Sequence, residues 1–289
     1  MLEAPSIQWF PGHMAKTRRL ITDNLKMVDI VLELVDARIP QSSRNPELDK
    51  WLGDKPRIIM LNKADAADPV KTQQWLEYYQ RQKIAAIACD CKSGKGLHQF
   101  LPLVKNELCE LLERRKQRGV VNRPIRIMVV GIPNVGKSSF INRMAKGKRA
   151  KVEDRPGVTR SKQWVNLGTD LELLDMPGVL WPKFEDPLVG EKLAFTGAIK
   201  DDVVDIELLA MRLLAFLRRE YPKTIEQRYK LEGTNYQDLE EFDLLELVGR
   251  KRGMLISGGE VNTERAAITI LDEYRGNQLG RITFDRPDI

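Results

Sequence analysis

A glycine-rich loop from Gly131 to Ser138 fits the pattern G-x-x-x-x-G-K-S. It follows the apolar run 125–130, which predicts a buried strand, and it precedes a helical segment at 137–146. The glycines let backbone N–H groups point at phosphate oxygens, and the helix offers its positive N-terminal end. We expect Lys137 to reach the β- and γ-phosphates of a nucleotide and the Ser138 hydroxyl to ligate Mg²⁺. The predicted nucleotide contacts from this loop are Asn134, Val135, Gly136, Lys137, Ser138 and Ser139.

A second phosphate-side motif, Asp175–Gly178 with the sequence D-M-P-G, ends the predicted strand 171–175. Its Asp175 is expected to hold Mg²⁺, and the N–H of Gly178 is expected to face the γ-phosphate. Alone, D-x-P-G is a common turn. Thr159 lies between the two motifs, where it is expected to close over Mg²⁺ when the γ-phosphate is present.

A guanine-recognition motif, N-K-A-D, follows the predicted strand 57–61 and contributes Asn62, Lys63 and Asp65. A carboxylate at Asp65 can accept hydrogen bonds from N1–H and N2–H of guanine, which adenine cannot supply. This argues for GTP rather than ATP. The motif comes before the phosphate loop, whereas in an ordinary GTPase it comes after it. The order of motifs therefore predicts a circularly permuted GTPase.

The motif order resembles that of the TRAFAC-class GTPases with permuted motifs. Within that class, residues 7–14 (I-Q-W-F-P-G-H-M) and 35–40 (V-D-A-R-I-P) resemble the ribosome biogenesis GTPase A family, also called YlqF. The resemblance spans nearly the whole chain. It implies a role in late assembly of the large ribosomal subunit, with ribosomal RNA and ribosomal proteins as partners.

The resemblance also places a base-contacting loop at Cys91 and Lys92, which we count among the nucleotide-binding residues. Here the usual S-A-K is replaced by Asp90-Cys91-Lys92. This departure puts the loop's contribution to guanine binding in doubt.

The usual set of catalytic residues lacks one member, because Val179 follows Gly178 at the position where many GTPases have a Gln that orients the attacking water. The resemblance is to hydrophobic-substituted GTPases, which obtain water positioning from elsewhere. His13 is one candidate, because a neutral imidazole can orient water; a histidine that only packs or caps is the alternative. Our candidate catalytic residues are His13, Lys137, Thr159 and Gly178, and we expect slow turnover by the isolated chain.

A second candidate for the missing catalytic contribution is Asn134. In GTPases with P-N-V-G-K-S, this Asn can help to hold a monovalent cation beside the β- and γ-phosphates. Potassium at this place would supply the positive charge that an arginine finger otherwise provides. The alternative is an Asn that merely suits a turn. The predicted metal ligands are Ser138, Thr159 and Asp175 for Mg²⁺ and Asn134 for K⁺.

Positive charge is concentrated in one part of the chain. Residues 105–163 hold 16 Lys or Arg against 5 Asp or Glu, whereas residues 205–289 hold 13 against 16. The basic residues 114–118 and those between 146 and 160 are expected to surround the nucleotide switches and to contact RNA phosphates. A solvated helix C-terminus is the alternative for 114–118. In the C-terminal part, 249–255 and 257–259 are either local RNA contacts or turns between packed helices.

Alternating strands and helices predict an α/β fold with a mostly parallel sheet and the nucleotide at the carboxyl ends of its strands. The predicted strands are 28–35, 57–61, 84–88, 125–130, 162–167 and 171–175. Apolar residues recur at helical spacing in 206–217, 237–248 and 261–275. We therefore expect a permuted GTPase domain at 1–188 and a small all-helical domain at 189–289.

Composition fits a soluble, globular chain of 289 residues with 42% hydrophobic and 30% charged residues. No apolar run is long enough to span a bilayer, and no secretory signal is visible. Three cysteines with no second C-x-C or histidine pair favour neither a disulfide framework nor a zinc site. We expect a cytoplasmic monomer.

Two functions remain open from the sequence. The first is an RNA-dependent GTPase that docks on an immature large subunit with GTP bound and leaves after hydrolysis. The second is a nucleotide-gated protein-interaction module with weak catalysis and a partner that is not RNA. ATP use is a more distant possibility, against which Asn62 and Asp65 argue. GTP-dependent, salt-sensitive association with ribosomal particles separates the first two.

Overall fold

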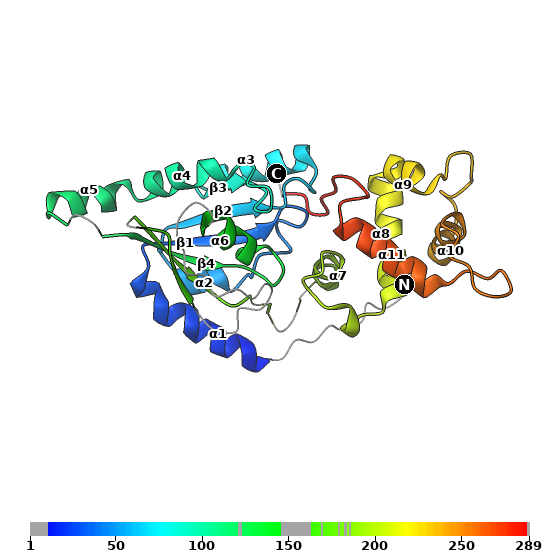
Figure 1. The fold of residues 1–289 in the computed structure, drawn as a ribbon, viewed down its shortest axis with the longest axis horizontal. Helices are drawn as coiled ribbons and strands as arrows, with labels where there is room; N and C mark the ends of the chain where they lie inside the picture. The colour runs from blue at the N-terminus through cyan, green and yellow to red at the C-terminus, as the bar shows by residue number, and fades with distance from the viewer. Residues whose placement is uncertain are drawn as a thin grey trace. The chain divides into compact units, whose positions relative to one another are not determined.

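The computed structural model of the chain describes residues 11–120, 123–145, 163–168, 170–178, 180–181, 184 and 186–287. It divides into two compact units (Figure 1). One comprises Gln8–Lys183 together with Thr283–Ile289 and is called the GTPase unit below. The other comprises Met1–Ile7 and Phe184–Ile282, and its part from Phe184 to Ile282 is called the helical unit below.

In its described part, the GTPase unit is built on a six-stranded sheet with the order β3-β2-β1-β4-β6-β5. The strands are β1 (Ile30–Asp36), β2 (Arg57–Asn62), β3 (Ala85–Ala88), β4 (Ile125–Val130), β5 (Gln163–Asn166) and β6 (Leu171–Asp175). Only β5 runs antiparallel to its neighbour among these pairs. The predicted α/β class, the mostly parallel sheet and each of the six predicted strands are confirmed.

The strand order shows how the permutation is accommodated. β1 pairs with β2 on one side and with β4 on the other, so Ile30 lies opposite Ile127 and Glu33 opposite Val130. Reading β4, β5 and β6 before β1, β2 and β3 gives the motif order of an ordinary GTPase. Only the connections differ, because the sheet holds each strand by its neighbours in space rather than by its place in the sequence.

Helices cover both faces of this sheet (Figure 1). They are α1 (Pro11–Asn24), α2 (Leu48–Leu52), α3 (Pro69–Arg81), α4 (Phe100–Glu107), α5 (Cys109–Gln117) and α6 (Lys137–Ala145), with 3₁₀ turns η1 (Leu25–Met27) and η2 (Leu97–Gln99). Apolar residues of α1 and α2, such as Ile21 and Trp51, pack against β1, β4 and β6. Trp75 and Tyr79 of α3 pack against β1 and β2. Every residue of β1 is buried, and the strand is apolar apart from Glu33 and Asp36, as expected for a central strand covered on both faces.

The helical unit contains α7 (Pro187–Phe195), η3 (Asp201–Val203), α8 (Ile206–Glu220), α9 (Pro222–Tyr229), α10 (Glu241–Lys251) and α11 (Thr263–Arg275). The three helices predicted from periodicity are confirmed as α8, α10 and α11. A buried carboxylate, Glu273, accepts hydrogen bonds from Arg228 (2.6 Å), Tyr229 (3.0 Å) and Arg252 (2.6 Å). This network fixes α9, α11 and the end of α10 to one another, because a buried charge is tolerated only when it is paired.

After the helical unit, residues 283–287 return to the GTPase unit; we call them the C-terminal strap. The Phe284 N–H donates to the Arg38 carbonyl at 2.8 Å, and the Thr283 hydroxyl accepts from the Asp68 N–H at 3.0 Å. The side chains of Thr283 and Phe284 are buried. The strap therefore lies on the segment after β1 and on the start of α3, next to the guanine-recognition motif.

Candidate guanine nucleotide site

The phosphate loop between β4 and α6 has the tight backbone that the glycine pattern predicts. A Cβ on Gly131 would lie 2.6 Å from the Leu34 carbonyl oxygen, and Gly136 has φ +103. Only glycine fits at these two positions, because a side chain would meet backbone in the first case and would be strained in the second. The loop delivers Lys137 and Ser138 to the first turn of α6.

Lys137 is buried and its Nζ donates to the carbonyls of Gly131 at 3.0 Å and Ile132 at 2.8 Å. Burial lowers the pKa of Lys137 to about 8, although the negative charge of Asp175 acts in the opposite direction. The Lys137 ammonium therefore lies within the phosphate loop and near Asp175. From there it can bind a phosphate chain placed at the N-terminus of α6. This is the role predicted for Lys137.

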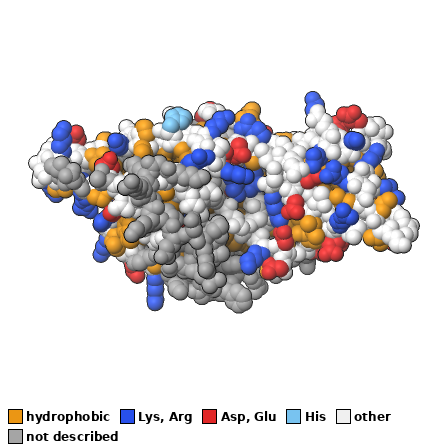
Figure 2. Space-filling model, viewed as in Figure 1, with side chains coloured by type: hydrophobic (Ala, Val, Ile, Leu, Met, Phe, Trp, Pro, Cys, Tyr) orange, Lys and Arg blue, Asp and Glu red, His pale blue; other side chains and the backbone are white. Residues whose placement is uncertain are grey.

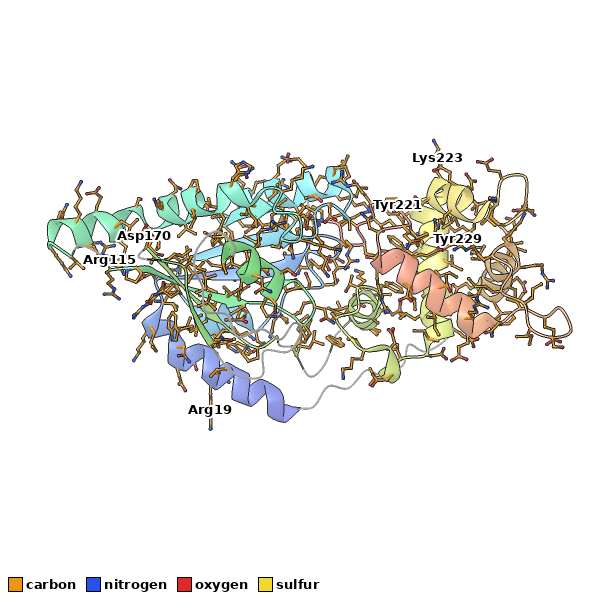
Figure 3. All side chains as sticks on the ribbon, viewed as in Figure 1. Arg19, Arg115, Asp170, Tyr221, Lys223 and Tyr229 are labelled. Carbon is orange, nitrogen blue, oxygen red and sulfur yellow. The ribbon has the colours of Figure 1, made fainter. Side chains whose placement is uncertain are left out.

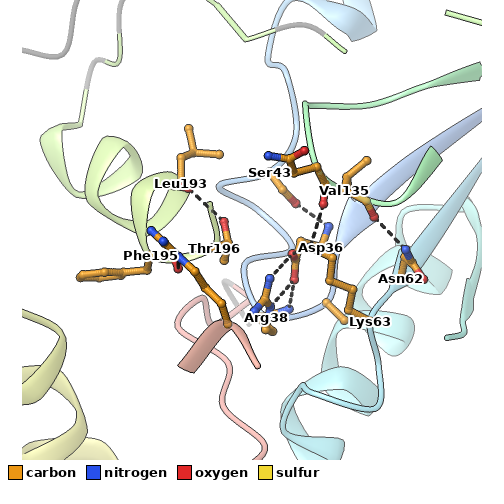
Figure 4. Close-up of polar contacts among 12 residues, drawn as sticks. Asp36, Arg38, Ser43, Asn62, Lys63, Val135, Leu193, Phe195 and Thr196 are labelled. Carbon is orange, nitrogen blue, oxygen red and sulfur yellow. Dashed lines mark hydrogen bonds and ion pairs between the residues drawn. The ribbon is translucent and has the colours of Figure 1, made fainter. Parts of the chain in front are cut away.

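The guanine motif holds the phosphate loop in place (Figure 4). Asn62 Nδ2 donates to the Val135 carbonyl at 2.7 Å, and Lys63 Nζ donates to the Asn134 carbonyl at 2.8 Å. Both Lys63 and Asn134 have positive φ, +61 and +57, so each loop presents its backbone at a sharp turn. The loop predicted to recognise the base and the loop predicted to surround the phosphates thus form one connected structure.

A buried ion-pair network lies behind this contact (Figure 4). The Asp36 carboxylate, at the end of β1, accepts from Arg38 Nε at 2.9 Å and Nη2 at 2.8 Å, and Lys63 Nζ lies 3.0 Å from its second oxygen. Burial acts to raise the pKa of Asp36, but the charges of Arg38 and Lys63 outweigh it and keep that pKa well below its usual range. Asp36 is therefore an anion that fixes Lys63 against the phosphate loop.

The predicted base side of the site comprises Asp65 and the loop after β3. Asp65 is exposed, as expected of a carboxylate that is predicted to receive guanine. Asn62 Oδ1 accepts from the Cys91 N–H at 2.9 Å, so Asn62 connects the base loop to the phosphate loop. Asp90 accepts from the N–H groups of Lys92 (2.8 Å) and Ser93 (3.0 Å). The D-C-K departure from S-A-K therefore keeps the turn, because the Asp90 carboxylate closes it.

The phosphate side is completed by the end of β6. Asp175 is buried at the last position of the strand, and a Cβ on Gly178 would lie 2.9 Å from Pro133 and 3.0 Å from Lys137 Nζ. Glycine is required here because the D-x-P-G segment crosses directly over the phosphate loop. The hydroxyl of Ser138 and the carboxylate of Asp175 are the hard oxygen ligands that Mg²⁺ prefers.

The described residues contain no group of three or more His, Cys, Asp or Glu that could hold a metal by themselves. This fits a magnesium ion that takes one or two protein oxygens and completes its shell with phosphates and water. Bound there, Mg²⁺ would neutralise charge on the β- and γ-phosphates.

Some predicted residues cannot be placed. Thr159, Val179 and the basic residues between 146 and 160 lie outside the described residues, and only the backbone of His13 is described, in α1. His98 is exposed within η2, before α4.

The prediction that residues 114–118 surround the nucleotide switches is wrong. Arg115 of α5 pairs with Asp29, which directly precedes β1, and Arg118 shares a cleft with Pro56, which directly precedes β2. These are the amino ends of the strands. The nucleotide motifs follow the carboxyl ends, at the opposite edge of the sheet.

Two parts of the site were not predicted from the sequence. The Asp36–Arg38–Lys63 network was seen only as part of a family motif, and the C-terminal strap was not foreseen. The sequence did contain a signal for the Asp36–Arg38–Lys63 network. An acidic residue, Asp36, ends a mostly apolar strand and stands two positions before Arg38. The strap leaves no local signal, because its partners are more than 200 positions away.

These elements together define a circularly permuted P-loop GTPase. A protein-family model described as 50S ribosome-binding GTPase matches residues 126–250. The match begins at β4 and leaves out Asn62, Lys63 and Asp65, as expected when the base-recognition half comes first.

Relatives match over almost the full length. Ribosome biogenesis GTPase A of Priestia megaterium is 53% identical over 98% of this chain and 97% of its own. Mitochondrial ribosome-associated GTPase 1 of Xenopus tropicalis is 35% identical over 96% and 94%. GDP-bound YlqF from T. maritima superimposes with a TM-score of 0.66 at 27% identity, covering 93% of this chain and 99% of that one. The chain belongs to the ribosome biogenesis GTPase A family, and it is a GTP-hydrolysing enzyme.

Proposed function

We propose that this chain binds the immature large ribosomal subunit with GTP in its site and hydrolyses the GTP during late assembly. The observation that carries the proposal is the joined site, in which Asn62 and Lys63 hold the phosphate loop beside an exposed Asp65. Such a site selects guanine and cradles phosphates. The names of the relatives supply the ribosomal partner.

The test is GTP hydrolysis by the purified chain with and without large ribosomal subunits, using ATP as the control nucleotide. Strong stimulation confined to GTP is the expected result. If GTP binds but subunits do not stimulate hydrolysis, the alternative of a nucleotide-gated protein-interaction module takes its place.

Catalysis is assigned to Lys137, Gly178, Thr159 and His13. The burial of Lys137 beside Asp175 and the closeness of Gly178 to the phosphate loop support the first two. For His13, the support is its place in the N-terminal segment together with the missing Gln at Val179. His13→Ala should slow subunit-stimulated hydrolysis with nearly unchanged nucleotide affinity. A lost affinity would instead assign His13 a structural role.

The metal ions are Mg²⁺, held by Ser138, Asp175 and Thr159, and K⁺, held with the help of Asn134. The exposed position of Asn134 and its left-handed backbone, φ +57, support the second ion, because they leave the side chain at the mouth of the loop. Hydrolysis should be faster in potassium than in sodium at equal ionic strength. Asn134→Ala should remove that difference, and equal rates in the two salts would refute the K⁺ site.

The partners in the subunit are ribosomal RNA and ribosomal proteins, with local RNA contacts at the end of α10. Arg250 and Lys251 are exposed there, whereas Arg252 is held by Glu273 at 2.6 Å. Gly249 serves packing, since a Cβ on it would lie 2.4 Å from Val261. Arg250 and Lys251 are therefore the better candidates within this segment.

The chain is proposed to act as a cytoplasmic monomer. Among the described residues, no helix combines the length and the apolar character needed to cross a membrane. Size-exclusion chromatography with light scattering, with and without GTP, tests the monomer. The structure differs from the domain limits 1–188 and 189–289 predicted from the sequence, because residues 283–289 belong to the GTPase unit and the division falls at residues 183–184. Limited proteolysis near residues 184 and 282 tests this division.

A further inference from the structure

A cleft of about 640 Å³ lies at the edge of the GTPase sheet opposite the nucleotide motifs. It is lined by Asp29 and Pro56, which directly precede β1 and β2, by Arg123, which lies two positions before β4, and by α5. Helix α5 and Arg115 lie at the left end of the GTPase unit in Figure 3. The cleft is therefore separate from the GTP site described above.

The lining is rich in positive charge. Six basic side chains face three acidic ones: Lys26, Lys55, Arg114, Arg115, Arg118 and Arg123 against Asp29, Glu107 and Glu110. Figure 2 shows several Lys and Arg side chains at this end of the GTPase unit. Since the basic residues come from η1, the segment before β2, α5 and the segment before β4, the fold gathers them from four places in the sequence.

The acidic residues do not neutralise the cleft. Asp29 is committed to Arg115, and both side chains are nearly buried, at 8% and 12% exposure. Glu110 and Arg114 form an exposed pair at 3.5 Å, which contributes little. In the described part of the chain, Lys26, Arg118 and Arg123 are exposed and have no carboxylate within ion-pair distance.

The chemistry of the lining favours a polyanion with repeated phosphates. An exposed guanidinium group can donate two parallel hydrogen bonds to two oxygens of one phosphate. The described lining has no aromatic residue, so it lacks an aromatic anchor for a protein partner and a platform on which bases could stack. What remains is recognition of a sugar–phosphate backbone without reading its sequence.

We propose that this cleft is a second, sequence-independent RNA-backbone site, which acts with the GTP-dependent contacts but lies at the opposite edge of the sheet. The inference rests on the proposed function in that the RNA is ribosomal. It commits to RNA phosphate rather than to a ribosomal protein.

The test is the triple charge reversal Lys26→Glu, Arg118→Glu and Arg123→Glu in the full chain. These three residues have no carboxylate partner in the described structure, so the fold should be retained. The matched control reverses Arg81, Lys83 and Lys105, which are exposed and lie outside the cleft. Binding to protein-free large-subunit ribosomal RNA is measured by filter retention over a salt series, and basal GTP hydrolysis is measured in parallel.

The cleft variant should bind RNA at least about tenfold more weakly, and its plot of log affinity against log salt should be shallower by about 2, as expected from the loss of three phosphate contacts. Its basal GTP hydrolysis should equal that of the wild type, because the GTP site is at the other edge. The control variant should lose much less RNA affinity.

Equal losses in both triple variants would reduce the effect to bulk charge and overturn the proposal. Unchanged RNA binding by the cleft variant would overturn it as well. Weaker binding to whole subunits with normal binding to protein-free RNA would indicate a ribosomal protein in the cleft. Failure of subunits to stimulate wild-type hydrolysis would count against the proposed function, and the RNA measurement would still decide the cleft.

Discussion

Ser42 donates two hydrogen bonds to the Asp285 carboxylate, one from its backbone N–H at 2.7 Å and one from its hydroxyl at 2.9 Å, across 243 positions of sequence. Both residues are buried. Ser42 belongs to the segment that follows Asp36, the carboxylate that pairs with Arg38 and fixes Lys63. The end of the chain is thus part of the scaffold that holds the guanine-recognition motif.

Asp285→Ala should destabilise the GTPase unit by about 2 kcal/mol, since it removes both acceptors and leaves a buried N–H without its bond. The measurement is urea unfolding followed by a probe in the GTPase unit. Asp54→Ala, at an exposed position, is the control and should change stability by less than about 0.5 kcal/mol. Equal stability of the two variants would show that the strap contributes nothing.

Asn62→Ala should weaken GDP and GTP binding by roughly tenfold or more. The variant loses the bonds to Val135 and to Cys91, and hence the connection between the phosphate loop and the base loop. Titration with a fluorescent GDP analogue measures this. Gln73→Ala, an exposed amide in α3, should leave the affinity unchanged.

Gly136→Ala should weaken nucleotide binding strongly but measurably in an otherwise folded chain, because the new Cβ would lie 2.2 Å from Asn62 Nδ2 at φ +103. Part of the damage passes through Asn62, so the double variant Gly136→Ala, Asn62→Ala should be less impaired than the sum of the single effects. Strict additivity would mean that backbone strain alone is responsible. Gly253→Ala, at φ +67 in open space, isolates the cost of such strain.

Asp65→Asn should shift the preference of the site from guanine to xanthine nucleotides. The amide can donate to the xanthine 2-oxo group, whereas it cannot accept both guanine N–H groups. Competition binding with GDP and xanthosine diphosphate measures the switch. An unchanged preference would place guanine recognition elsewhere.

GTP binding should take up protons above pH 8, because burial lowers the pKa of Lys137 to about 8 and phosphates restore its charge. The pH dependence of folding stability that follows from this lowered pKa has the opposite sign from that of a lysine whose pKa is raised by an acidic partner. Between pH 8 and 10.5 the unfolded chain binds more protons than the folded one, so this group's contribution to stability rises with pH. Calorimetric titration at pH 8.5 in buffers of different ionisation enthalpy measures the uptake. Lys137→Arg, which stays charged, should show less.

Much of the fold could be predicted from short-range patterns. Most strands, such as β2 and β4, are largely apolar runs bounded by turn residues, and the phosphate and guanine loops have fixed spacings that backbone geometry imposes. The positions of Asn62 and Gly136 followed from those spacings. Their contact could be expected only because both motifs end at one edge of a parallel sheet.

The sequence did not predict the position of the basic residues 114–118, and the length of the two helices that lead to them explains why. Residues 100–117 form α4 and α5, which together span roughly 25 Å at 1.5 Å per residue. A run of this length starts near the nucleotide edge after β3 and ends at the other edge of the sheet. Closeness in sequence to the base loop was therefore a poor guide to position in space.

The C-terminal strap also changes what the helical unit is. Residues 184–282 leave the GTPase unit after the D-x-P-G segment and rejoin it at Thr283, beside the guanine motif. In covalent terms the helical unit is an insertion with two attachment points, not a terminal appendage. A force on the helical unit is transmitted to the predicted γ-phosphate side through the junction after the D-x-P-G segment. It is transmitted to the predicted base side through the junction at Thr283. A single proteolytic cut within it would leave both fragments anchored to the GTPase unit.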